Sequence, residues 1–411
     1  MGIGVNFVFF QYLLFFCGYM LLYLSRQSIP IALPLLIDTD HVKLSYFFAC
    51  FSFFYGVSKF VNGIVMDSKN NPLFMFGLCN IATGLLTIGI TLSYNNLTLL
   101  LLTLILLAWT QGLGWPAITK FMVTNSSISS IASSWGVMSA SQQLGSCITL
   151  IVLPSIIKIY DAKSAFLYSG LLSLLFGIYI ILKAYYKESA NFTTYYKVHK
   201  SQIGIKVTSS IWFLCCATFC AYIIKMGIFF WFPIILRDKL QISLVQSSLI
   251  TGVYDLGGIL GTLITGRISD MYFFQNRSLL ALFYMLGIAL TFIAMNFGQN
   301  IILMNLGAIL SGFFIFGVQV LTGVIAVEIA PQNNVCAIVS LTGLFGYIAS
   351  SIFSCVLLGV LVKHCGNSIM FSFFSICSVI ALVCFSILSS KDLKKLSKRC
   401  KKHFSTVKLC R

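Results

Sequence analysis

A strongly charged side chain lies deep inside an otherwise apolar stretch near the start of the chain. Arg26 belongs to the run GYMLLYLSRQSIPIALP, from Gly18 to Pro34. Twelve residues, or about 18 Å of helix, separate it from Asp38, the first acid of the chain. An arginine at that depth in hydrocarbon costs at least about 2.5 kcal/mol, and snorkelling spans too short a distance to free it fully. We therefore expect Arg26 to line an aqueous cavity and bind an anion; the alternative is a structural arginine held by a neighbouring helix.

Two lysines also lie within apolar stretches. Lys225 lies eight residues before Pro233, the same spacing that separates Arg26 from its own proline, which indicates equal depth in two related segments. Lys59 shares a helical face with Tyr55, but it lies only two turns from Asp67, so partial snorkelling stays open as an alternative.

One acid lies well inside an apolar stretch. We expect Asp255 to form an ion pair with a lysine that an arriving anion would release, with a proton relay as the alternative. Three cations, Arg26, Lys59 and Lys225, against this one carboxylate suit a doubly charged anion, and a phosphate ester is the obvious small one.

The elements that position these residues are membrane helices. Hydrophobic residues make up 58% of the chain and charged residues 9%, with a mean hydropathy of +0.95 over 411 residues. This composition predicts an all-α membrane protein with many bilayer-spanning segments. No cleavable signal peptide is expected, because the first apolar stretch has no basic n-region and contains Arg26. We expect twelve spans, at residues 7–36, 45–66, 73–93, 97–122, 131–158, 163–185, 209–236, 244–268, 278–297, 300–327, 336–362 and 367–390.

The distribution of basic residues predicts the orientation. Of 27 Lys and Arg residues, eighteen fall on the side of the termini, six on the opposite side and three within spans. Both termini are therefore expected in the cytosol. The net charge of +17 is concentrated in cytosolic segments, which indicates contact with the lipid surface and no nucleic-acid partner.

An internal repeat divides the chain into two halves. The string from Gly63 to Asp67 recurs as Gly266 to Asp270, an offset of 203 residues, and the charge-to-proline pairs recur at an offset of 199. We expect six-helix bundles at 1–185 and 209–390, a basic hinge loop at 186–208 and a basic tail at 391–411. Parallel halves with pseudo-two-fold symmetry are the arrangement of major facilitator transporters. Asp67 and Asp270 are expected to act in gating and assembly and not as substrate ligands.

Several strings resemble the organophosphate:phosphate antiporters, with the eukaryotic glucose-6-phosphate transporters as the nearest likeness. The resemblance runs from Tyr19 to about Phe371. It is carried by YLSRQSIPIALP around Arg26, VSKFVNG around Lys59, QGLGWP, IIKMGIFFW around Lys225, VYDLGGILGT around Asp255, EIAP and LTGLFGY.

The resemblance implies a secondary transporter in a lipid bilayer, and a monomer is the default expectation. It would exchange a phosphorylated sugar or polyol for inorganic phosphate, with Arg26, Lys225 and Lys59 binding the phosphoryl group. Contacts to the organic moiety are expected from Tyr19, Tyr23, Tyr55, Gln142 and Tyr347. No metal spacing, nucleotide loop or catalytic nucleophile is present, so no cofactor and no enzyme activity are expected.

Some positions depart from the pattern of that family: Ala117 replaces a proline, Gln142 a histidine, Phe230 an acid and Ser68 an arginine. Three alternatives remain open. The same fold could carry another organic anion, the protein could be a membrane sensor of sugar phosphate, or it could be a structural subunit of a larger complex.

Overall fold

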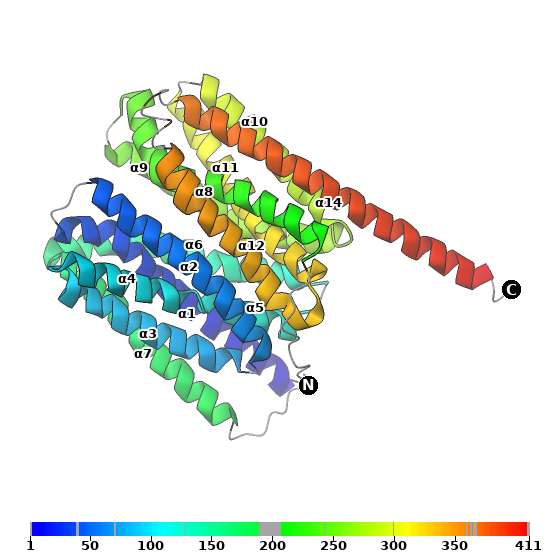
Figure 1. Ribbon diagram of the computed structural model, residues 1–411, viewed down its shortest axis with the longest axis horizontal. Coiled ribbons are helices and arrows are strands. Elements are labelled where there is room, and N and C mark those ends of the chain that lie inside the picture. Colours follow the sequence, from blue (N-terminus) through cyan, green and yellow to red (C-terminus); the bar gives the residue numbers. More distant parts are fainter. Residues whose placement is uncertain are drawn as a thin grey trace. The chain divides into compact units, whose positions relative to one another are not determined.

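The computed structural model describes residues 2–37, 41–69, 71–127, 129–188, 207–242, 244–298, 300–358, 361, 364 and 368–408. Every regular element within these residues is helical (Figure 1). The first seven helices are α1 (Gly2–Leu36), α2 (His41–Ser68), α3 (Pro72–Ser93), α4 (Leu97–Gln111), α5 (Gly114–Asn125), α6 (Ile131–Ile159) and α7 (Ala162–Glu188). They are followed by α8 (Ser209–Leu240), α9 (Leu244–Tyr272), α10 (Arg277–Phe297), α11 (Ile301–Ile329), η1 (Gln332–Asn334), α12 (Val335–Ala349), the π-helix η2 (Ser350–Leu357) and α14 (Ser368–Lys408).

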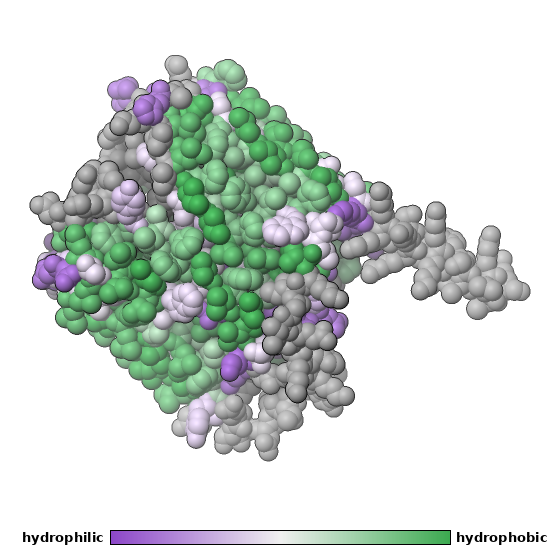
Figure 2. Space-filling model, viewed as in Figure 1, coloured by the Kyte–Doolittle hydropathy of each residue, from purple (hydrophilic) through white to green (hydrophobic). Residues whose placement is uncertain are grey.

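Twelve segments within the described residues are long and apolar enough to span a membrane, as the sequence predicts. Large apolar side chains on these helices remain exposed, including Leu92 at 81% and Phe297 at 82%. Figure 2 shows such hydrophobic side chains over the visible flanks of the helices. Since an exposed apolar flank on a continuous helix is what hydrocarbon solvates, the protein is an integral multi-pass membrane protein.

The fourth expected span is not one continuous helix. α4 ends at Gln111, and α5 begins at Gly114. A Cβ atom at Gly112 would come within 2.8 Å of the Lys59 backbone nitrogen, so α2 approaches the chain closely at this break. The hydroxyl of Ser58 donates to the carbonyl of Trp109 beside it. The helix break therefore fixes α4 and α5 against the turn of α2 that carries Lys59.

The structure divides into two compact units. Unit 1 contains 1–127, 137–206 and 330–360, and unit 2 contains 128–136, 207–329 and 361–411. α12 thus groups with the first helices of the chain, and the start of α6 with the later ones. The two halves expected from the internal repeat remain a prediction. Of the expected hinge loop 186–208, residues 189–206 lie outside the described residues.

Within unit 1, α3 and α7 pack through glycines and lie side by side (Figure 1). A Cβ atom at Gly84 would come within 2.6 Å of the Gly170 carbonyl oxygen, and one at Gly170 within 2.8 Å of the Gly84 oxygen. Such small residues let two helix backbones approach closely, which is how membrane helices gain packing energy in lipid. In unit 2, α14 packs against α10 and α8, and α9 against α11.

Candidate functional site

Arg26 lies half-buried on α1 within a shell of neutral groups. Its Nε donates to Gln111 Oε1 (2.9 Å), and one terminal nitrogen donates to the Tyr23 hydroxyl (3.1 Å). The guanidinium carbon lies 4.0 Å from the centroid of the Tyr55 ring and 4.6 Å from that of Tyr23. Among the described residues, no carboxylate pairs with Arg26. Its positive charge is held by an amide oxygen, a hydroxyl and two π faces, which leaves the charge available to an anion.

An aromatic cluster surrounds this arginine within unit 1. Ring centroids lie 5.2 Å apart for Tyr19 and Tyr23, and 5.2 Å apart for Tyr19 and Trp115. Tyr55 meets Tyr347 of α12 edge to face, with centroids 4.6 Å apart. All of these side chains are buried. Four of the five residues that the sequence predicts for the organic moiety therefore lie in the same unit as Arg26 and close to it.

Lys59 is the second cation of unit 1, with 6% of its surface exposed. Its ammonium lies 5.9 Å from the Trp115 ring centroid and 5.6 Å from that of Tyr347. Both distances fall within the range of cation–π attraction. The ammonium thus shares the aromatic cluster with Arg26.

Unit 2 contains the third cation. Lys225 on α8 is 6% exposed, and its Nζ donates to Gln319 Oε1 of α11 at 2.6 Å. The ammonium lies 5.3 Å from the Tyr222 ring centroid and 4.9 Å from that of Phe316. Asp255 of α9 is half-buried, and Lys225 is near enough to interact with it electrostatically. The environment of Lys225 therefore resembles that of Arg26 in its glutamine oxygen and aromatic faces, and differs from it in the nearby carboxylate of Asp255.

Two aspartates each bind the amino-terminal end of a helix. Asp67 accepts from the backbone nitrogens of Cys336 and Ala337 at the start of α12, both at 2.9 Å. Asp270 accepts from the backbone nitrogens of Ala132 (3.3 Å) and Ser133 (2.7 Å) at the start of α6. A carboxylate at this end satisfies free N–H groups and complements the helix dipole. These equivalent contacts fit the equivalent positions of the two aspartates in the repeat.

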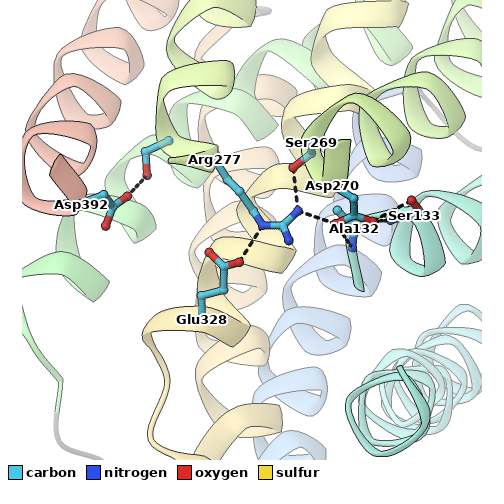
Figure 3. Close-up of polar contacts among 8 residues, drawn as sticks. Ala132, Ser133, Ser269, Asp270, Arg277, Glu328 and Asp392 are labelled. Atoms are coloured by element: carbon cyan, nitrogen blue, oxygen red, sulfur yellow. Dashed lines mark hydrogen bonds and ion pairs between the residues drawn. The ribbon is translucent and has the colours of Figure 1, made fainter. Parts of the chain in front are cut away.

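The two caps differ in what surrounds them, and Figure 3 shows the surroundings of Asp270. Arg277 is fully buried and donates to both Asp270 (2.8 Å) and Glu328 (2.6 Å), with a further bond to Ser269 (2.8 Å). At Asp67, the nearby cation is Lys120, whose ammonium donates to the main-chain oxygen of Asp67 at 3.1 Å. The Asp270 cap is thus part of a buried ionic network, whereas the Asp67 cap relies on helix N–H groups.

The comparisons with known proteins identify the family. Residues 15–354 match the family described as the Major Facilitator Superfamily. The chain belongs to this superfamily.

Two of the relatives of this chain are named as transporters of phosphorylated compounds, and a third is named as a sensor. The chain is 25% identical to the glycerol-3-phosphate transporter of Bacillus subtilis, over 85% of each chain. It is 26% identical to the hexose-6-phosphate:phosphate antiporter of Escherichia coli, over 85% of this chain and 82% of the relative. It is also 26% identical to the membrane sensor protein UhpC of Escherichia coli, over 82% of each. These names describe transporters and a sensor, not enzymes, and they agree with the predicted resemblance.

A solved structure supports the fold alone. A bacterial homologue of the iron transporter ferroportin, in an outward-facing state, matches with a TM-score of 0.76 at 13% identity, over 92% of this chain and 99% of that one. The prediction of a twelve-helix major facilitator fold is therefore confirmed, including its all-helical class within the described residues.

The predicted site residues of the facilitator fall into two groups. Arg26, Lys59 and the tyrosines lie together in unit 1. Gln142 belongs to the same unit and is buried on α6, whereas Lys225 and Asp255 lie in unit 2. That Arg26 and Lys225 act on one cavity remains a prediction, as does an ion pair of Asp255.

Sequence reasoning overlooked the roles of Gln111 and Trp115. Both belong to the string QGLGWP, for which the sequence indicates only a family resemblance. A glutamine and a tryptophan in an apolar stretch could have indicated these roles, because each has a polar atom that needs a hydrogen-bond partner when buried.

Proposed function

We propose that this facilitator exchanges a phosphorylated sugar or polyol for inorganic phosphate by alternating access. The observation that carries the proposal is the environment of Arg26, a half-buried guanidinium bound by a glutamine, a tyrosine hydroxyl and aromatic faces with no carboxylate among the described residues. Relatives named for glycerol-3-phosphate and for hexose-6-phosphate support the same class of anion.

In this proposal, each cation has a defined part. Arg26 and Lys225 bind the phosphoryl oxygens, because a guanidinium and an ammonium form charge-assisted hydrogen bonds with them. Lys59 supplies a third positive charge. The organic moiety contacts Tyr19, Tyr23, Tyr55, Gln142 and Tyr347, whose rings and polar tips suit a hydroxylated carbon chain. No covalent step is required, since exchange needs only binding and reorientation.

The capping aspartates are proposed to act in gating. Asp67 lies in the first predicted half and caps α12 of the second, and Asp270 lies in the second and caps α6 of the first. Release of both caps would free the two halves to move during each cycle.

We further propose that both termini are cytosolic, from the excess of basic residues on that side, and that the transporter acts as a monomer.

Exchange in proteoliposomes tests the proposal. Purified protein in liposomes preloaded with phosphate should take up labelled phosphate saturably. Glucose-6-phosphate or glycerol-3-phosphate should compete with labelled phosphate for uptake. Phosphoenolpyruvate is tested as a third competitor, because it is a phosphate ester of different shape. Arg26→Ala should abolish exchange because it removes the guanidinium and leaves the fold, which a normal elution profile would check.

A sensor is the second candidate, since one relative is named a membrane sensor protein. A sensor would bind sugar phosphate with the wild-type residues and yet show no flux. Binding without exchange would therefore favour the sensor, and neither binding nor exchange with any phosphate compound would reject both candidates in favour of another organic anion.

A further inference from the structure

α2 and α12 pack against each other in a regular register within unit 1. We name the contact the α2–α12 seam and define it by Tyr55, Gly56, Lys59, Gly63 and Asp67 on α2, against Cys336, Ser340, Gly343 and Tyr347 on α12. A Cβ atom at Gly56 would come within 2.8 Å of Tyr347 Cβ, and one at Gly63 within 2.7 Å of the Cys336 oxygen. The helices are therefore in close contact from the Asp67 cap to the aromatic cluster.

Lys59 is the exception in this seam, because it has a long charged side chain where its neighbours have glycines. It fits because the facing residue is Gly343. A Cβ atom at Gly343 would lie 2.8 Å from the Lys59 Nζ and 3.0 Å from its Cε. The end of the lysine side chain thus occupies the space above the Gly343 backbone, which only glycine leaves empty.

The Lys59 ammonium has no hydrogen-bond acceptor among the residues that the structure describes. Besides the Gly343 backbone, it lies near the rings of Trp115 and Tyr347, at the outer range of cation–π attraction. An ammonium offers three donors, and a buried charge without hydrogen bonds is costly. Gly343 lies seven residues beyond Cys336, about 10 Å along α12 from the end that Asp67 caps. The ammonium is therefore held at the level of the aromatic cluster with its donors unused.

The second seam of the repeat has no such charge. In unit 2, Gly266 and Gly136 bring α9 and α6 together, and Asp270 caps α6 as Asp67 caps α12. The residue equivalent to Lys59 at the offset of 203 is Thr262, whose hydroxyl donates to the Ile259 carbonyl of its own helix. Close packing of a seam therefore does not require a lysine. Packing alone does not explain why Lys59 is paired with Gly343.

We propose that Gly343 is a positioning residue for Lys59, which holds the ammonium beside Arg26 with its donors free for an entering anion. This inference rests on the proposed function, because it assigns the ammonium to the same phosphate-binding site. A methyl group at position 343 would displace only the flexible end of Lys59, so the packing of the seam would survive and the cation would shift.

The test is a double-mutant cycle on the full-length protein in nanodiscs. Inorganic phosphate binding is measured for wild type, Gly343→Ala, Lys59→Met and the double variant. Gly343→Ala should weaken phosphate binding about fivefold when Lys59 is present, and should change it less than about twofold in the Lys59→Met background. Gly63→Ala, the same substitution in the same seam, is the matched control, and its effect should be equal in both backgrounds.

Two results would overturn the inference. Equal weakening by Gly343→Ala in both backgrounds would mean that the glycine acts through helix packing. Unchanged phosphate binding by Gly343→Ala when Lys59 is present would mean that the ammonium does not need this position. Thermal unfolding of the same four proteins tests the Lys59–Gly343 contact without ligand. The contact is supported if Gly343→Ala lowers the unfolding midpoint when Lys59 is present and lowers it less in the Lys59→Met background. Wild-type protein that binds no phosphate would reject the proposed function and the anion role of Lys59, while the unfolding cycle would still report the contact.

Discussion

At the scale of single residues, the chemistry depends on how a buried positive charge is stabilised without being neutralised. Arg26 and Lys225 each have a glutamine oxygen and aromatic faces as neighbours. A carboxylate in the place of Gln111 would attract Arg26 more strongly and would compete with an entering anion. The neutral acceptor leaves the charge of Arg26 in place for a ligand, whereas Lys225 also interacts electrostatically with the carboxylate of Asp255.

The ring of Tyr55 should contribute more to phosphate binding than its hydroxyl group. The guanidinium carbon of Arg26 lies 4.0 Å from the ring centroid, so Tyr55→Phe retains the cation–π contact. Tyr55→Leu removes it and should weaken phosphate binding by about 1 kcal/mol, or roughly fivefold. Competitive phosphate binding to the two purified variants measures the difference. Equal affinities for the Phe and Leu variants would contradict a role for the ring.

The sequence was sufficient to find the charges but not their partners. Arg26, Lys59 and Lys225 stand out because a cation in an apolar stretch costs free energy in a membrane and is usually functional. Gln111 and Gly343 could not be assigned a role, because each meets its cation through a contact between segments that are far apart in the chain. Side-chain contacts of this kind depend on helix register, which hydropathy does not encode.

At the scale of helices, the two capping aspartates should differ in how much they stabilise the protein. Asp67→Asn loses one of two bonds to α12, because an amide has only one acceptor oxygen, and should cost about 1 kcal/mol. Asp270→Asn also removes a carboxylate from the buried Arg277 and should cost about 3 kcal/mol or more. Thermal unfolding midpoints measure both variants.

The control for this comparison is Asp161→Asn. Asp161 is exposed and caps the backbone nitrogen of Ser164 at 2.8 Å with a single oxygen. Asparagine caps helices about as well as aspartate, so this variant should unfold like wild type. A loss at position 161 as large as at position 270 would show that the buried ionic network adds nothing.

The packing of α3 on α7 gives a second prediction at this scale. Gly84→Ala would place a methyl group 2.6 Å from the Gly170 oxygen and the Leu174 nitrogen, which are backbone atoms that cannot move aside. We expect a loss of about 1–3 kcal/mol from overpacking, visible as a lower unfolding midpoint. Gly89→Ala on the same helix has only Thr103 Cγ2 at 3.8 Å and should unfold at or above the wild-type midpoint. If the two variants unfold alike, the close approach does not stabilise the pair.

The sequence predicts that the membrane-spanning helices exist more securely than it predicts where they are interrupted. Twelve spans follow from apolar length alone. The break at Gly112 and the π-helix from Ser350 to Leu357 do not, because the first depends on where α2 approaches and the second on hydrogen-bond register within a continuous apolar segment.

At the scale of the whole molecule, transport should require a bound anion in both directions. Arg26 and Lys59 have no carboxylate partner among the described residues, so the empty protein has positive charge that it must desolvate in order to reorient. A charge within hydrocarbon costs at least about 2.5 kcal/mol, and each 1.4 kcal/mol slows a step about tenfold. Phosphate would cancel this charge, so exchange should be at least about tenfold faster than net uptake.

Proteoliposomes with and without internal phosphate measure this ratio at equal external phosphate. Liposomes that contain Arg26→Ala provide the leak rate to be subtracted from both. The same pair of measurements with internal sulfate separates a requirement for phosphate from a requirement for any divalent anion. Uptake that is equally fast into phosphate-free liposomes would mean that the empty protein reorients freely, and that Asp255 or another group neutralises the cations when no substrate is bound.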